Sequence, residues 1–117
     1  SSLMKHAETG LKQALEKIAI KKPVGTFIPN VLGEPVEEPE IIRRLLAEQL
    51  THPVQWVKTM QSVVRLRLAG ELLELGPGRV LKGLARKINP DLKVTAIEKK
   101  NDLDQLKSPT QVPYGNP

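Results

Sequence analysis

The sequence has no cysteine, two histidines and only one residue each of phenylalanine, tryptophan and tyrosine. Without cysteine there is no disulfide framework, no thiolate zinc site and no cysteine nucleophile. Phe27, Trp56 and Tyr114 are too few to stack on a series of unpaired bases. The apolar runs are short, so no segment approaches the ~20 residues that span a bilayer, and no signal peptide is expected at the N-terminus.

What the sequence does contain is typical of a globular protein. Its 117 residues are 39% hydrophobic and 26% charged, which fits one domain or a piece of a larger one. The net charge is +5, and most of the basic excess lies in the C-terminal half. This excess is modest beside that of proteins that coat nucleic acid.

The spacing of apolar residues predicts alternating helices and strands. We expect four helices, over residues 3–20, 39–50, 53–69 and 79–88, and three short strands, over residues 24–28, 71–75 and 93–97. Strands separated by helical crossovers predict an α/β fold with a mainly parallel sheet. The leucine-rich strand 71–75 is expected to be buried on both faces, as in parallel sheets.

Apolar stripes mark the expected inner face of each helix. They are Met4, Ala7, Leu11, Ala14, Leu15 and Ile18; then Ile41, Ile42, Leu45, Leu46 and Leu50; then Val54, Val57, Met60, Val64 and Leu68; and finally Val80, Leu81, Leu84 and Ile88. Three short strands cannot cover so much apolar helix surface. We therefore expect the chain to be the C-terminal part of a larger α/β protein.

Between a strand and a helix, Gly76-Pro77-Gly78 allows two interpretations. Backbone N–H groups at the start of a helix attract anions, so the turn could hold a phosphate. The next glycine is Gly83, however, which matches neither common phosphate-loop pattern. We favour a tight turn that brings strand and helix close together.

No constellation of residues indicates an active site. His6 and His52 are far apart in sequence and are expected in surface or capping roles. No serine lies in a G-x-S-x-G elbow. Glu71 and Glu74 are three apart on a strand and should point to opposite faces, so they do not form an acid/base pair.

Basic residues gather around the last predicted helix. They are Arg79, Lys82, Arg86 and Lys87, with Arg65, Arg67 and Lys93 nearby in sequence. We favour a solvated helix face, because no nucleic-acid-binding motif accompanies the charge. The alternative is a non-enzymatic basic α/β module that binds nucleic acid or an acidic protein.

Three local strings, taken in order, identify a family. They are Ser1-Ser2-Leu3-Met4-Lys5, Gln49-Leu50-Thr51-His52-Pro53-Val54-Gln55-Trp56, and Glu74-Leu75-Gly76-Pro77-Gly78-Arg79-Val80-Leu81. Together they closely resemble the C-terminal part of malonyl-CoA:acyl carrier protein transacylases. The resemblance covers residues 1–98, and residues 99–117 form a polar tail outside it.

The resemblance implies an α/β-hydrolase-like acyltransferase core and a catalytic serine that carries the malonyl group from coenzyme A to the thiol of acyl carrier protein. In the family the catalytic histidine directly precedes the first string, which here begins at Ser1, so the 117-residue chain by itself is expected to be inactive. The resemblance gives Gln49 one role: its backbone carbonyl orients that histidine. Trp56 and Val57 are expected in the core beneath this junction, and Gly76-Pro77-Gly78 near the active-site cleft.

The same resemblance implies partners and a location. Acyl carrier protein, the coenzyme A thioester and the remainder of the acyltransferase are the expected partners, with no nucleic acid and no membrane. No cofactor and no metal are expected, and malonyl-CoA is a substrate. The expected location is cytoplasmic.

Overall fold

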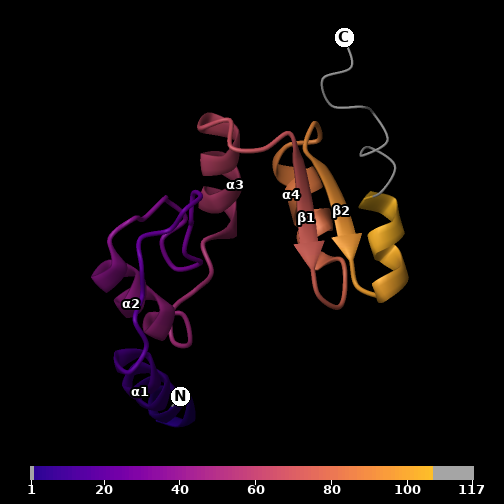
Figure 1. Ribbon diagram of the computed structural model, residues 1–117. Coiled ribbons are helices and arrows are strands. Elements are labelled where there is room, and N and C mark those ends of the chain that lie inside the picture. Colours follow the sequence, from indigo (N-terminus) through magenta and orange to yellow (C-terminus); the bar gives the residue numbers. More distant parts are fainter. Residues whose placement is uncertain (1, 107–117) are drawn as a thin grey trace. The chain divides into compact units, whose positions relative to one another are not determined.

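The computed structural model describes residues 2–106, which fold as two compact units with their boundary between Leu68 and Ala69 (Figure 1). The first unit contains helices α1 (Ser2–Glu16), α2 (Pro39–Glu48) and α3 (Trp56–Arg65). The second contains strand β1 (Glu71–Leu75), helix α4 (Val80–Ile88), strand β2 (Lys93–Ile97) and the 3-10 helix η1 (Lys100–Leu106). No helix within residues 2–106 is long and apolar enough to cross a membrane.

Helix α1 ends at Glu16, four residues before the predicted end. The backbone N–H groups of Lys17 and Ile18 bond three residues back, to Ala14 and Leu15, which tightens the last turn. Of the predicted apolar stripe, Leu11 and Leu15 are half-buried, whereas Met4 and Ile18 are exposed. The stripe is therefore mostly uncovered within the described residues.

The predicted strand at residues 24–28 is wrong. A strand needs a ladder of backbone bonds, and this segment is joined to residues 29–40 by a single one, from the Val36 N–H to the Phe27 carbonyl (3.0 Å). Val24 is fully exposed, while Phe27 packs against the core. Pro23 and Gly25 favour an irregular chain here, and their effect outweighs the β-propensity of the neighbouring residues.

Helix α2 confirms the predicted start at Pro39, a residue that suits the first turn of a helix. It supplies the core of the first unit. This core consists of Val36, Ile42 and Leu45, with Ile20, Phe27, Val31 and Leu46 packed against it. Ile41, which was predicted to face inward, is 40% exposed.

Helix α3 is shorter than predicted and buries a different face. It starts at Trp56 rather than Pro53 and ends at Arg65 rather than Ala69. Its buried residues are Thr59, Ser62 and Val63, whereas Val54, Val57, Val64 and Leu68 are exposed and Met60 is half-buried. Trp56 is half-buried, but the expected core position of Val57 is wrong, because that side chain is 55% exposed.

A close approach between α3 and the loop before α2 explains which face is buried. The fully buried Ser62 hydroxyl donates to the Gly33 carbonyl (2.6 Å). Gly33 has φ +73°, and a Cβ there would lie 2.5 Å from the Lys58 Cβ. A polar and a small residue at this contact let two backbone segments meet, which apolar periodicity alone does not predict.

In the second unit, β1 and β2 pair in parallel, with Glu71 opposite Lys93 and Leu75 opposite Ile97. The bounds of both strands match the prediction, and so does the helix between them to within one residue. An α/β unit with parallel strands and a helical crossover is therefore confirmed. Ala85 of α4 and Ala96 of β2 are buried.

Two expectations for this unit are wrong. Strand β1 is not buried on both faces, because Leu73 is 47% and Leu75 is 74% exposed. Val80 is 70% and Leu84 is 38% exposed, so the α4 stripe is not wholly inward; Leu81 and Ile88 are half-buried. In the two-stranded sheet β1 has a neighbouring strand along one edge only, which leaves it partly exposed.

Helix η1 follows β2 and was not predicted. The Asp102 carboxylate accepts bonds from the backbone N–H groups of Glu98 (2.9 Å) and Lys99 (2.8 Å), which fold the chain back beside β2. These two bonds, that from Lys99 first, hold the pKa of Asp102 below its ordinary value of 3.8. The rest of the predicted polar tail, residues 107–117 with Tyr114, lies outside the described residues.

Candidate active-site junction

The residue that the sequence analysis singled out, Gln49, forms the C-terminal cap of α2. Its backbone has φ −61° and ψ −21°, and its N–H donates to the Leu45 carbonyl (3.2 Å). The residue four positions on is Pro53, which has no N–H, so the helical ladder cannot use the Gln49 carbonyl. Among the backbone bonds of the turns, loops and caps within residues 2–106, none goes to this oxygen. The carbonyl is thus available to a donor from elsewhere.

The turn after Gln49 is fastened to the end of α2. The Glu48 carbonyl accepts bonds from the Thr51 N–H (3.0 Å) and from His52 Nδ1 (2.8 Å). A carbonyl only accepts, so this contact places the ring proton on Nδ1. The predicted capping role of His52 is confirmed, and the turn that presents the Gln49 carbonyl is held by its neighbours.

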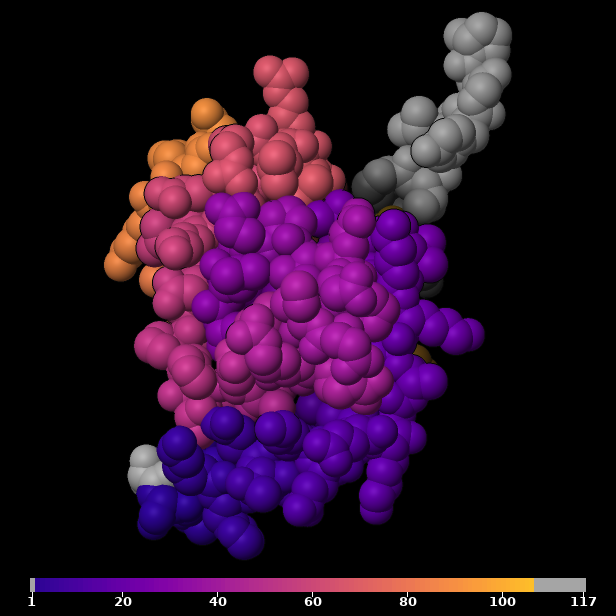
Figure 2. All heavy atoms as spheres, turned by 90° about the vertical axis from the view of Figure 1, so that its left-hand side faces the viewer, coloured from indigo at the N-terminus to yellow at the C-terminus, as the bar shows by residue number. Residues whose placement is uncertain are grey.

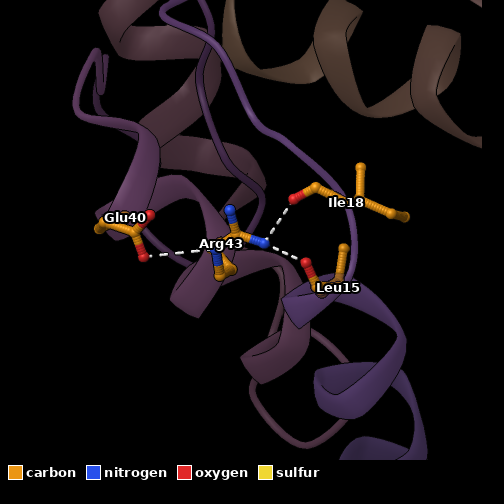
Figure 3. A network of polar contacts seen from close by, with 4 residues as sticks. All are labelled: Leu15, Ile18, Glu40 and Arg43. Atoms are coloured by element: carbon orange, nitrogen blue, oxygen red, sulfur yellow. Dashed lines mark hydrogen bonds and ion pairs between the residues drawn. The ribbon is translucent and has the colours of Figure 1, made fainter.

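Helix α1 packs antiparallel to α2. The Arg43 guanidinium, in the middle of α2, donates to the carbonyls of Leu15 and Ile18 (2.8 Å for Ile18) at the end of α1, and also to Glu40 (3.3 Å; Figure 3). Near the other end of the pair, the Thr51 hydroxyl donates to the Glu8 carboxylate. The N-terminal half of α1 therefore lies on the same side as Gln49.

A pocket of about 400 Å³ lies between these two helices. Its lining carries both signs of charge: Glu8, Lys12, Glu16, Glu40, Arg43, Arg44, Ala47 and Glu48. Figure 2 shows the indigo atoms of α1 beside the purple and magenta atoms that follow them in sequence. Within residues 2–106 no group of three or more histidine, cysteine or carboxylate side chains could hold a metal ion. The mixed charges favour no single ionic ligand.

The turn Gly76-Pro77-Gly78 follows β1 directly, and its glycines have φ +123° and +89°. The backbone N–H groups at the start of α4 already have an acceptor within the chain. The Glu74 carboxylate accepts bonds from the N–H groups of Leu81 (3.1 Å) and Lys82 (3.0 Å). The favoured interpretation, a tight turn, is confirmed, because an internal carboxylate takes the place that a phosphate would need.

The two glutamates of β1 have separate partners, as predicted. Glu71 faces Lys93 (3.8 Å) and Thr95 (3.2 Å) on β2, whereas Glu74 bonds to α4. They point to opposite faces of the sheet and form no acid/base pair. His6 is exposed on α1, in keeping with the surface role expected for it.

The predicted basic cluster is divided between the two units. Arg65 and Arg67 belong to the first, where Arg65 pairs with Glu34 (2.8 Å). In the second, Lys82, Arg86 and Lys93 border a pocket of about 280 Å³ lined by residues of α4, β2 and the loop between them. Arg79, Arg86 and Lys87 are exposed, which agrees with a solvated face of α4.

Two residues that organise these sites were missed by the sequence analysis. Arg43 stands beside a second arginine and gives no sign that it reaches carbonyls 25 and 28 positions away. Glu74 was considered only as a possible acid. A carboxylate that precedes a glycine turn and a helix start is a signal for capping, and it could have identified Glu74.

Comparison with known proteins gives a consistent result. No family model matches the sequence. Among curated proteins, the malonyl CoA-acyl carrier protein transacylase of Bacillus subtilis is 35% identical over 97 residues, covering 83% of this chain and 30% of that protein. The human mitochondrial transacylase is 36% identical over 90 residues, covering 74% of this chain and 23% of that protein. The chain thus spans about a third or less of the relatives it matches.

Solved structures agree with these sequence matches. An acyl-carrier-protein S-malonyltransferase from Bartonella henselae is 34% identical, with a TM-score of 0.75, over 91% of this chain and 33% of that one. A malonyl-transacylase in complex with its type II polyketide synthase acyl-carrier protein is 36% identical, with a TM-score of 0.75, over 88% of this chain and 33% of that one. The resemblance stated from the three strings is confirmed: over most of its length the chain is similar to malonyl CoA-acyl carrier protein transacylases, about one third of whose length it spans.

Proposed function

We propose that this chain is the C-terminal part of an enzyme that transfers a malonyl group from coenzyme A to the thiol of acyl carrier protein in fatty-acid biosynthesis. The observation that carries the proposal is the similarity to transacylases over 83–91% of the chain. The reaction has two steps. A serine oxygen attacks the malonyl thioester and releases the coenzyme A thiol; the thiol of the carrier then takes the malonyl group and restores the serine.

The proposed enzyme has an α/β-hydrolase-like core, of which residues 1–98 supply the C-terminal portion. Its nucleophilic serine and its catalytic histidine belong to polypeptide outside the sequence described here. The parallel strands β1 and β2 with the crossover helix α4 are compatible with such a core. On this proposal the 117-residue chain alone transfers no malonyl group.

In this reaction Gln49 is a positioning residue. Its backbone carbonyl accepts a bond from the catalytic imidazole and so fixes which ring nitrogen carries the proton. A neutral carbonyl does this without placing a second anion near a site that binds the malonyl carboxylate. Two observations support the role: Pro53 leaves the Gln49 carbonyl outside the helical ladder, and α1 runs antiparallel to α2, with its N-terminal half near Gln49.

The proposed partners are acyl carrier protein and the coenzyme A thioester. The structure of one related transacylase is of its complex with its acyl-carrier protein. Coenzyme A carries phosphates and acyl carrier proteins are typically acidic, so the net charge of +5 would speed encounter with both. The proposed reaction draws on no metal or cofactor, and its proposed location is the cytoplasm.

The test uses a hybrid in which this chain replaces the matching segment of the Bacillus subtilis transacylase. Malonyl transfer from radiolabelled malonyl-CoA to acyl carrier protein is measured. We expect activity from the hybrid and none from the 117-residue chain. A folded hybrid that binds acyl carrier protein without transferring malonyl would contradict the proposal.

Two variants of the hybrid test the role of Gln49. Proline at position 50 disfavours the α conformation of the preceding residue, the one that Gln49 adopts, so Leu50→Pro should displace its carbonyl. Gln49→Ala leaves the backbone in place and removes only the long contact between Gln49 Oε1 and Asn30 Nδ2 (3.5 Å). We expect kcat to fall at least about tenfold in Leu50→Pro, with a shifted pH profile, and by less than about twofold in Gln49→Ala. Equal activity of the two variants would contradict the role.

A further inference from the structure

Helix α1 turns one narrow face toward the rest of its unit. Its half-buried residues are Glu8, Leu11 and Leu15, which are three and four positions apart and therefore lie on one side of the helix. No residue of α1 is fully buried, and among residues 2–10 every residue but Glu8 is exposed. A carboxylate thus continues the inner face toward the N-terminal end, at a place where an apolar residue would normally lie.

The Glu8 carboxylate contacts the turn that presents the Gln49 carbonyl. Thr51, two residues after Gln49 and also half-buried, donates its hydroxyl hydrogen to Glu8. The Glu48 carbonyl lies 3.4 Å from the same hydroxyl and is the weaker acceptor, because it is neutral. The Thr51 oxygen lies 3.1 Å from His52 Nδ1, which carries the ring proton. The hydroxyl can therefore accept from His52 and donate to Glu8 at the same time.

A second contact fixes the other end of the helix. The Arg43 guanidinium of α2 donates to the carbonyls of Leu15 and Ile18 at the C-terminal end of α1 (Figure 3). A helix held at one point can pivot about that point. With Arg43 at one end and the bond between Glu8 and Thr51 toward the other, both the place and the rotation of α1 are set relative to the turn after α2.

We propose that Glu8 and Thr51 are a pair of positioning residues, whose bond places the N-terminal end of α1 relative to the Gln49 carbonyl and so aligns the catalytic imidazole with that carbonyl. The proposal rests on the proposed function, in which the catalytic histidine directly precedes Ser1. A hydrogen bond weakens steeply as its angle departs from linear, so a small rotation of α1 would spoil the bond from the imidazole. The pair acts through the imidazole and not on the substrate.

The test uses the hybrid with the Bacillus subtilis transacylase and removes the bond from either side. Thr51→Val and Glu8→Ala should each lower kcat at least about fivefold and change KM for malonyl-CoA by less than about twofold. Thr51→Ser keeps the hydroxyl and should stay within about twofold of the parent hybrid. The double variant Glu8→Ala/Thr51→Val should be no slower than the slower single variant, because the second substitution removes a bond already lost.

The pH profile separates a positioning role from a merely structural one. A carbonyl that accepts from an imidazole favours the protonated ring, so misalignment of that carbonyl lowers the pKa of the catalytic histidine. The acidic limb of the kcat/KM profile should therefore move to lower pH in Thr51→Val and in Glu8→Ala. A smaller amount of folded protein lowers the rate at every pH and leaves the limb in place.

The second unit provides a matched control. There the Thr95 hydroxyl donates to the Glu71 carboxylate (3.2 Å), which is the same kind of bond in a unit that does not contain Gln49. Thr95→Val should leave kcat within about twofold and the pH profile unchanged. An equal effect of Thr95→Val and Thr51→Val would overturn the proposal.

Two further results would contradict the pair: an acidic limb that does not move in Glu8→Ala, and losses that add in the double variant. Alanine is the residue that most favours a helix, so Glu8→Ala leaves α1 able to form. This variant decides the test even where a variant at Thr51 does not fold.

The proposed function is judged separately, with the free 117-residue chain. Glu8→Ala should speed the amide exchange of residues 5–12 at least about threefold in that chain, and unchanged exchange contradicts the pair. Faster exchange together with a folded hybrid that transfers no malonyl contradicts the proposed function, and with it the role in catalysis, but not the contact that fixes α1. An active hybrid in which both variants keep the parent kcat and pH profile contradicts the positioning role alone.

Discussion

The contacts that stabilise each of the two units internally are of different kinds. In residues 2–68, distant segments are joined by side chains that bond to backbone carbonyls, as Arg43 does to Leu15 and Ser62 to Gly33. In residues 69–106 a regular parallel pair carries the fold, and carboxylates bond to backbone N–H groups a few positions away, as Glu74 and Asp102 do. The first unit therefore depends on contacts between residues far apart in sequence, and the second on local contacts and one strand pairing.

Among the tested substitutions, replacing glycine by alanine should give the largest difference in stability loss between the two units. Gly33→Ala combines an unfavourable φ with a clash against the Lys58 Cβ, so we expect a loss of about 2–4 kcal/mol in the free energy of unfolding. Gly78→Ala in the second unit has the unfavourable φ of +89° but open space, and should lose about 1–2 kcal/mol. Urea unfolding measures both, with Gly25→Ala as a nearly neutral control. Equal losses at Gly33 and Gly78 would contradict the close approach.

Removing Arg43, which joins α2 to the end of α1, should have the next largest effect on stability. Arg43→Ala deletes charged donors to two carbonyls from a side chain that is only 19% exposed, and should cost about 2–3 kcal/mol. Amide exchange in α1 should rise while that of β2 stays unchanged. Arg44→Ala, which removes a 63% exposed partner of Glu48, is the matched control and should cost well under about 1 kcal/mol. Equal effects of the two would show that the contact between α1 and α2 does not depend on Arg43.

Removing the Glu74 carboxylate at the start of α4 should have a smaller effect on stability, and that effect should be confined to the second unit. Glu74→Ala removes the acceptor for the Leu81 and Lys82 N–H groups and should cost about 1–2 kcal/mol. Glu74→Gln keeps an acceptor oxygen, loses the charge, and should cost about 0.5 kcal/mol. Exchange at the first turn of α4 measures both. A loss that spreads into α2 would contradict the independence of the two units.

The weakest effect is expected from acid, at η1. The folded-state pKa of Asp102 is lowered by the bonds from Lys99 and Glu98, so its stabilising contribution is present above the ordinary value of 3.8 and is lost as the pH falls through the folded-state pKa. Titration by carbon NMR should place the Asp102 pKa below 3.8. In Asp102→Asn the protection of the Glu98 and Lys99 amides, relative to their intrinsic exchange rates, should no longer change with pH in this window. A pKa at or above 3.8 would contradict the bonds.

The comparison also explains which predictions succeeded. Strands β1 and β2 and helix α4 were placed to within one residue, because apolar runs, a glycine turn and the Asn89-Pro90 stop are all local signals. The strand at 24–28 and the inner face of α3 were wrong. Both depended on partners in other segments: Phe27 packs on the core below α2, and Ser62 meets Gly33 across 29 positions.

The sequence by itself indicated the resemblance to transacylases, through three strings taken in order, and it fixed the position of Gln49 four residues before Pro53. That the helical ladder cannot use the Gln49 carbonyl also follows from the sequence, because Pro53 has no N–H. Which end of α1 lies beside Gln49 was decided only by tertiary structure, because the antiparallel packing of the two helices depends on Arg43 and Thr51 reaching residues far from them in sequence. The exposure of Leu73 and Leu75 is likewise a tertiary property, because burial depends on which neighbours are present.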